Sequence, residues 1–144
     1  MANLGDVREI QGIGSVYYKY AWISECQVKW WGEKEIPIKL IFSAGRGDDI
    51  TDAQKRSFTA YQKEIRKIIS GGLGVLISFI KDDYGLDVTQ DEVFKVLTPV
   101  SILFRESGVW GILFDADFDV EGGVAFYQKG KNGEFYAGGQ DAFL

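Results

Sequence analysis

Residues 51–84 read TDAQKRSFTAYQKEIRKIISGGLGVLISFIKDDY, and the rest of the sequence is best understood outward from this segment. Its apolar side chains recur at intervals of three and four residues, which is the period of an amphipathic helix. They are Phe58, Tyr61, Ile65, Ile68, Leu73, Leu76, Ile77, Ile80 and Tyr84. The pattern predicts a long helix that buries one stripe of side chains against the remainder of the protein.

The beginning of this segment favours a helix, whereas its middle contains residues that disfavour one. Thr51 and Gln54 have the spacing of a capping box, in which the threonine oxygen and the glutamine side chain satisfy each other's backbone amides. Gly71 and Gly72 interrupt the middle, where each glycine costs about 1 kcal/mol relative to alanine. Two alternatives therefore stay open, one helix kinked at these glycines or two helices over 51–70 and 72–83.

The flanking segments have the alternation of strands. Residues 13–31 predict one or two strands, and residues 36–42 predict another. A second capping box, at Thr89 and Glu92, predicts a short helix that ends near Leu97. Four more strands are expected, the last two joined by an Asn-Gly hairpin turn at Asn132–Gly133, over residues 100–104, 109–115, 124–128 and 135–137.

These elements predict one α+β domain over residues 1–144. Antiparallel strands are expected before and after the long central helix, and the C-terminal strands are expected to form a β-meander. A length of 144 residues is typical of a single domain with a full hydrophobic core.

The composition excludes several kinds of protein. There is no histidine, which removes Ser-His-Asp and Cys-His catalysis and the usual zinc sites. A single cysteine, Cys26, rules out an internal disulfide framework and is expected to be a buried hydrophobic residue. The sequence has no apolar run long enough to span a membrane and no signal peptide, so we expect a cytoplasmic protein that does not bind membranes.

The charge is distributed unevenly along the chain. The net charge is −5, and residues 106–144 account for all of it with seven acidic residues against two lysines. Nucleic-acid binding requires a positively charged surface, so we expect no nucleic-acid partner. An acidic C-terminal region is instead suited to a basic protein partner. The sequence gives no indication of the oligomeric state.

The acidic residues are concentrated in residues 114–123, which read FDADFDVEGG. Alternation along an extended strand would place four carboxylates on one face, those of Asp115, Asp117, Asp119 and Glu121. They could form a polar or partner-binding surface, or they could bind a hard cation such as calcium, magnesium or manganese. The segment is not an EF-hand loop, because valine and phenylalanine stand at the obligatory glycine and glutamate positions. A carboxylate pair of the glycosidase type is a third alternative.

A pair of adjacent tryptophans, Trp30 and Trp31, is a second candidate for a surface feature. Neighbouring strand residues face opposite sides of a sheet, so one of the two indoles is expected outside the core unless both sheet faces are covered. Trp31 is therefore included with the acidic residues as a candidate partner-binding residue.

The acidic segment and the helix start together resemble a family of small stand-alone bacterial proteins of unknown function. The resemblance rests on Thr51 and Gln54, followed by Phe58 and Tyr61, and on the motif that runs from Leu113 to Gly123. Some members of the family are encoded near toxin genes, which implies a binding role of the immunity-protein type. We therefore expect a non-enzymatic binding protein without a cofactor or catalytic residues, and the alternative is a divalent-metal-binding protein or metal-dependent hydrolase.

Overall fold

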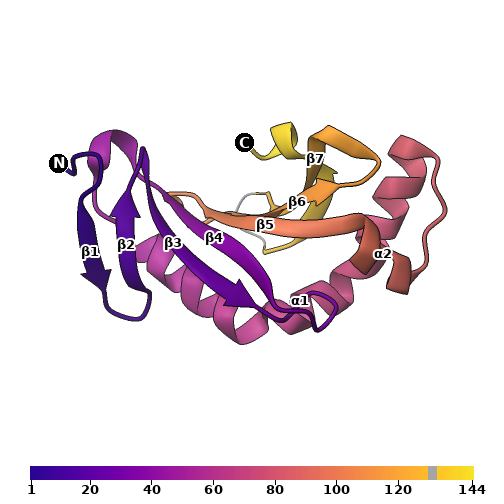
Figure 1. The fold of residues 1–144 in the computed structure, drawn as a ribbon, viewed down its shortest axis with the longest axis horizontal. Helices are drawn as coiled ribbons and strands as arrows, with labels where there is room; N and C mark the ends of the chain where they lie inside the picture. Colours follow the sequence, from indigo (N-terminus) through magenta and orange to yellow (C-terminus); the bar gives the residue numbers. More distant parts are fainter. Residues whose placement is uncertain (130–132) are drawn as a thin grey trace.

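The computed structural model describes residues 1–129 and 133–144, and these form an α+β fold with one mixed sheet and two α-helices (Figure 1). The N-terminal strands are β1 (Val7–Ile10), β2 (Gly14–Tyr18), β3 (Ala21–Val28) and β4 (Ile36–Ser43). The helices are α1 (Asp52–Tyr84) and α2 (Gln90–Val96). The C-terminal strands are β5 (Leu97–Phe104), β6 (Trp110–Ala116), β7 (Asp119–Gln128) and β8 (Phe135–Gly139). Two 3₁₀ turns, η1 (Gly45–Gly47) and η2 (Gln140–Ala142), complete the elements.

The eight described strands lie in the sheet in the order of the sequence. Neighbouring strands are antiparallel except at the centre, where Lys39–Phe42 of β4 run parallel to Ser101–Phe104 of β5. The predicted C-terminal meander is confirmed as β5–β8. The strands before the helix are antiparallel to one another and so are the strands after it, as predicted. The parallel β4–β5 pair joins the two groups, because α1 and α2 carry the chain back between two strands that point the same way.

α1 is a single continuous helix of 33 residues, so the two-helix alternative is wrong. Both halves of the predicted capping box are present, with Thr51 Oγ1 accepting from Gln54 N–H and Gln54 Oε1 accepting from Thr51 N–H. The second predicted capping box, at the start of α2, is also present. At the other end of α1, Gly85 adopts the left-handed conformation (φ 68°) that commonly ends helices.

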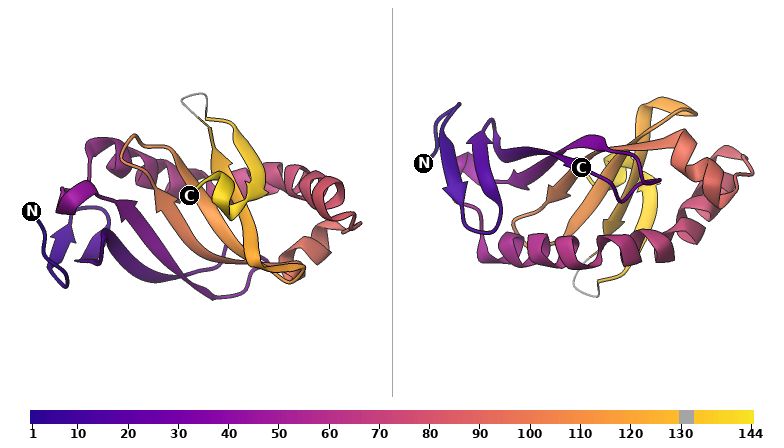
Figure 2. Two further views of the ribbon diagram at one scale, coloured as in Figure 1. Left: turned by 90° about the horizontal axis from the view of Figure 1, so that it is seen from above. Right: turned by 60° about the horizontal axis from the view of Figure 1, so that its bottom comes forward.

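One face of the sheet, which we call the α1 face, is covered by α1 along the length of the helix (Figure 2). Phe58, Tyr61, Ile65, Leu76 and Ile80 are buried there as predicted. Ile68 is half-buried and Ile69 occupies the buried position instead. The sheet contributes Ile38, Leu40, Ile102 and Phe104 to the same core.

The opposite face of the sheet carries a second, smaller cluster. Leu113, which we expected to meet α1, packs there instead with Leu103, Ala125, Tyr127 and Phe143. η2 and the C-terminus lie on this side, whereas α1 lies on the other (Figure 1). The predicted Asn132–Gly133 hairpin turn falls partly outside the described residues.

Candidate functional site

The acidic segment forms a hairpin turn and not one extended strand. β6 ends at Ala116, which pairs with Asp119 at the start of β7, so Asp117 and Phe118 are the two turn residues. Asp115 precedes the turn and pairs across the sheet with Thr98. The prediction that the four carboxylates share one strand face is therefore wrong, because the chain reverses in the middle of the alternating pattern.

Asp119 has a defined structural role in this hairpin. Its Oδ2 accepts a hydrogen bond of 2.6 Å from the Tyr84 hydroxyl, and its Oδ1 accepts one of 2.9 Å from the Gly122 amide. These two hydrogen bonds, the tyrosine bond first, lower the pKa of the Asp119 carboxyl. The same hydrogen bond to Asp119, with a smaller contribution from burial, raises the pKa of Tyr84 to about 12. The β6–β7 hairpin is thereby tied to the last turn of α1.

A surface cavity of about 590 Å³ lies beside this link and is lined by carboxylates from three elements. Asp83 comes from α1, Asp119 and Glu121 come from β7, and Asp141 comes from η2. Asp83 and Asp141 are also close enough to Tyr84 for their charges to raise its pKa. We call these four residues the acidic end. The sequence prediction included Asp119 and Glu121 but missed Asp83 and Asp141, which only the fold brings to the hairpin.

Within residues 1–129 and 133–144, no three side chains of the ligand types Asp, Glu, Cys or His are arranged to hold a metal ion. Asp115 and Asp117 do not line the cavity that Asp119 and Glu121 share. The predicted ligand set of Asp115, Asp117, Asp119 and Glu121 is therefore not assembled.

The candidate Trp31 is not available to a partner. It is 1% exposed, and its indole Nε1 donates to the Leu97 carbonyl oxygen at 2.8 Å. Trp30 is buried as well and donates to the Tyr61 hydroxyl. Both residues follow the end of β3 in a turn, so strand alternation does not apply to them, and the prediction for Trp31 is wrong.

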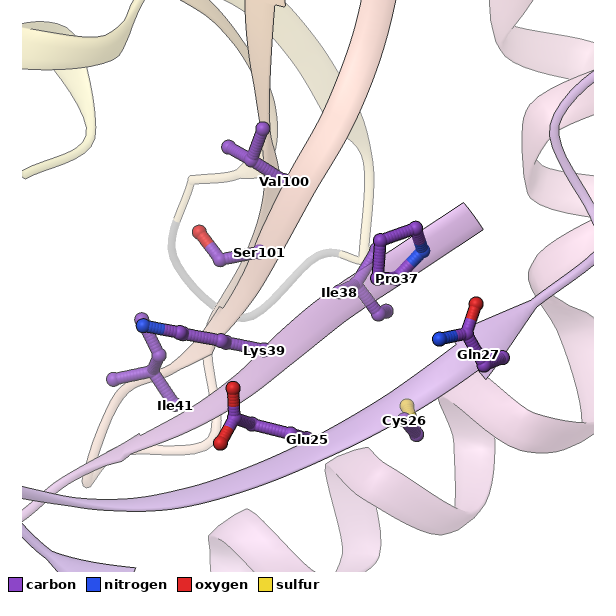
Figure 3. A pocket seen from close by; sticks show the side chains of 9 residues that line it. All are labelled: Glu25, Cys26, Gln27, Pro37, Ile38, Lys39, Ile41, Val100 and Ser101. Carbon is purple, nitrogen blue, oxygen red and sulfur yellow. The ribbon is translucent and has the colours of Figure 1, made fainter. Parts of the chain in front are cut away.

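A second surface region, which sequence reasoning missed, surrounds the end of β3. On the α1 face, Cys26 and Val28 line a cavity of about 440 Å³ together with Trp30 and Phe58. On the opposite face, Glu25 and Gln27 line another of about 570 Å³, next to β4 and β5 (Figure 3). Cys26 is half-buried, and burial raises the pKa of its thiol, so it remains a neutral lining group at physiological pH.

No family model matches the sequence, and no curated protein or solved structure matches it either. Among the described residues, no helix combines the length and hydrophobicity needed to cross a membrane.

Proposed function

We propose that this protein is a non-enzymatic binding protein whose acidic end recognises a basic partner protein. The observation that carries the proposal is the convergence of Asp83, Asp119, Glu121 and Asp141 around one cavity. None of the four forms an ion pair with a described lysine or arginine; the cations that do pair with acids lie elsewhere, at Arg8, Arg66 and Lys81. A basic partner would supply the missing countercharges.

The apolar surroundings of the acidic end also favour a protein partner. Val120 follows Asp119 in β7 and is 82% exposed, and Phe118 packs at 4.6 Å between ring centroids on Tyr84. An exposed apolar side chain bordered by polar groups is compatible with a protein interface, whose rim is polar and solvent-accessible. The resemblance to proteins encoded near toxin genes gives the proposal its specific form, an immunity-type protein that binds a basic toxin.

The charge of the acidic end predicts how the complex should form. Opposite charges speed the encounter between two proteins, and salt screens this effect. Neutralising the acidic end should therefore lower the association rate more than it changes the dissociation rate.

The test uses the proteins encoded beside this protein's gene as binding partners. Their association with the wild type and with the variant Asp83→Asn/Glu121→Gln/Asp141→Asn would be measured at low and high salt. A matched control, Glu9→Gln/Glu35→Gln/Glu64→Gln, changes the net charge equally at exposed positions outside the acidic end.

We expect the acidic-end variant to associate at least about tenfold more slowly than wild type at low salt, and the control to stay within about twofold. Equal slowing of both variants would show that only net charge matters. Failure of every neighbouring gene product to bind the wild type would contradict the proposal.

A further inference from the structure

The outer edge of β3 is only partly used by the sheet. β4 pairs with all of β3, from Ala21 to Val28. On the other side, β2 pairs with β3 only through Tyr17 with Ile23 and Tyr18 with Trp22. Figure 1 shows the β1–β2 hairpin meeting β3 at one end and separating from it along its length. Within the described part of the chain, Ser24–Val28 therefore have no strand on this side, and we call them the β3 edge.

Two observations show which backbone groups of the β3 edge point outward. Lys19 N–H donates to Ala21 O at 2.9 Å, so the backbone of Ala21 faces β2. Gln27 pairs across the sheet with Pro37, which has no N–H and therefore cannot donate to the Gln27 carbonyl oxygen. The backbone groups of Gln27 are thus directed away from β4. Backbone direction alternates along a strand, so the N–H and C=O groups of residues 21, 23, 25 and 27 all face the same side. Glu25 and Gln27 thus present their backbone groups at the vacant edge.

The side chains beside this edge alternate in character. Cys26 and Val28 face the α1 side, where the cavity of about 440 Å³ is lined by Ile13, Phe58 and Ile65. This volume is within the range of ligand-binding cavities. Glu25 and Gln27 face the opposite side, where Figure 3 shows Glu25 beside Lys39. Residues that pair across two strands project to the same face, so alternate side chains of a strand added here would meet the α1-side cavity and the charged pair of Glu25 and Lys39, which shares its cavity with Pro37 and Ile41.

The β3 edge also lacks most devices that discourage strand pairing. Edge strands are usually protected by lysine, proline, a bulge or a covering segment. Ser24–Val28 contain no lysine and no proline, and their pairing with β4 shows no register shift. Their one charged residue, Glu25, pairs across the sheet with Lys39 and accepts a hydrogen bond of 3.4 Å from the Tyr17 hydroxyl. Its carboxylate is exposed and can also accept from a basic side chain of a partner.

We propose that the β3 edge binds an extended segment of a partner protein as an added strand of the sheet. The segment continues the ladder that β2 begins and exchanges hydrogen bonds with the backbone of Glu25 and Gln27. Its residues opposite Cys26 are apolar and enter the α1-side cavity, and its residues opposite Glu25 are basic or polar. Strand addition of this kind gains affinity from the backbone and specificity from the pockets for alternate side chains.

The proposal does not depend on the acidic end, since the β3 edge lies on other elements. The probe is a displayed library of random 12-residue peptides, selected on the whole protein. Enriched peptides would be synthesised and their effect on amide hydrogen exchange measured by NMR. We expect the amides of Glu25 and Gln27 to become at least about tenfold more protected, while those of Ser24 and Cys26, already directed at β4, change little.

Two chemical variants separate strand addition from binding in the cavity alone. N-methylation of the peptide at the residues that face β3 should weaken binding at least tenfold, whereas N-methylation at the intervening residues should not. Gln27→Pro removes the outward N–H and should reduce affinity at least tenfold, whereas Gln27→Ala, which keeps the N–H, should stay within twofold. The two N-methylated peptides are tested on the unchanged protein, so they distinguish strand addition from binding in the cavity even if the Gln27→Pro variant does not fold.

Three results would overturn the proposal. No peptide is enriched, or enriched peptides leave the Glu25 and Gln27 amides unprotected. Alternatively, both amides are protected in the protein alone and more so as its concentration rises, which would mean that a second copy of this chain occupies the edge. Loss of binding to a basic partner at the acidic end, with peptide binding at β3 retained, would contradict only the proposed function.

Discussion

Gln54 is the residue through which the start of α1 is fixed to the sheet. It is fully buried, and its Nε2 donates to the carbonyl oxygens of Ser43 at 2.8 Å and Phe104 at 2.9 Å. Its Oε1 accepts from the Thr51 amide. One side chain therefore completes the capping box and also joins the ends of β4 and β5.

Gln54→Ala should destabilise the protein by roughly 3 kcal/mol, because buried backbone groups that lose a hydrogen bond cost about 1–3 kcal/mol each. Urea denaturation measures the change. The matched control is Gln62→Ala, an exposed glutamine on the same helix, which should stay within about 0.5 kcal/mol of wild type. Equal stability of the two variants would show that the Gln54 hydrogen bonds contribute nothing net.

The hydrogen bond between Tyr84 and Asp119 has a pH signature at each partner. The pKa of Asp119 is lower in the folded protein than in the unfolded chain, where it is near 3.8. The ionised carboxylate therefore stabilises the folded state above pH 3.8, and this contribution to stability is lost as the pH falls through the folded pKa. The folded pKa of Tyr84 is raised to about 12, so its stabilisation is complete below pH 10.0 and is lost as the pH rises from there towards 12.

Asp119→Asn should return the pKa of Tyr84 from about 12 towards 10.0, because the acceptor is no longer charged. NMR of isotopically labelled tyrosine rings follows the titration. Tyr61 is the internal control, since burial, and not a carboxylate, raises its pKa to about 12. A Tyr84 pKa unchanged by the substitution would show that Asp119 does not perturb it.

At the scale of elements, Gly71 and Gly72 show why the sequence alone leaves two alternatives open for α1. A glycine pair lowers helix propensity whatever its surroundings. Only the fold shows that Gly72 packs against the ring of Phe126, where a Cβ atom would overlap it, while Gly71 has nothing within 4 Å. The second glycine lets α1 approach β7, and the helix continues through both.

These neighbouring glycines predict opposite effects of the same substitution. Gly71→Ala should stabilise the protein by about 0.5–1 kcal/mol through helix propensity. Gly72→Ala should destabilise it by roughly 1–3 kcal/mol through overpacking, because Phe126 is 1% exposed and stacks on Phe135. Thermal unfolding of both variants provides the comparison. Changes of the same sign would refute the close packing of α1 on β7 at Gly72.

The acidic hairpin shows where strand alternation fails as a guide. Local signals were sufficient for the helix caps at Thr51 and Thr89, since a capping box lies within four residues. The turn at Asp117–Phe118 contains neither glycine nor asparagine. Because it is only two residues long, the alternation of acidic and apolar residues in the sequence runs through it without interruption. The acidic alternation therefore continues across a chain reversal, and the two glycines that follow it, Gly122 and Gly123, lie inside β7.

At the scale of the whole molecule, the sheet separates two hydrophobic clusters of unequal size, and Phe143 closes the smaller one. It is 5% exposed, stacks on Tyr127 at 5.2 Å and lies under the Arg105 guanidinium at 5.0 Å. Arg105 also donates a hydrogen bond to the Phe143 carbonyl oxygen. The C-terminal residues thus cover part of the sheet face that α1 leaves free.

Phe143→Ala should cost roughly 2–3 kcal/mol, less than the 3–5 kcal/mol expected at a central core position. It should also increase binding of a hydrophobic dye, because Leu103 and Leu113 become accessible. Leu144→Ala, at a position that is 65% exposed, is the control and should change neither measurement. Unchanged stability and dye binding in Phe143→Ala would mean that Phe143 does not cover this face.

The sheet topology at this scale was only partly predictable. Hairpins between successive strands follow from short connections, as in the β5–β8 meander. The vacancy at the β3 edge was not predictable, because it depends on β2 pairing with β3 at only two positions. The joining of Lys39–Phe42 to Ser101–Phe104 also depends on how the long helical crossover docks, which no local pattern encodes.

The parallel pairing of β4 with β5 has a consequence for the protein while it is being synthesised. Strands β1–β4 leave the ribosome with β4 as an unpaired edge, and its partner β5 follows only after α1 and α2 have been made. Exposed edges in incomplete chains promote aggregation. β4 carries Pro37 and Lys39, two residue types that discourage edge-to-edge pairing. In the finished fold Lys39 pairs with Ser101 of β5, and Pro37 lies just before the β4–β5 ladder. On the nascent chain both residues would protect β4 until β5 arrives.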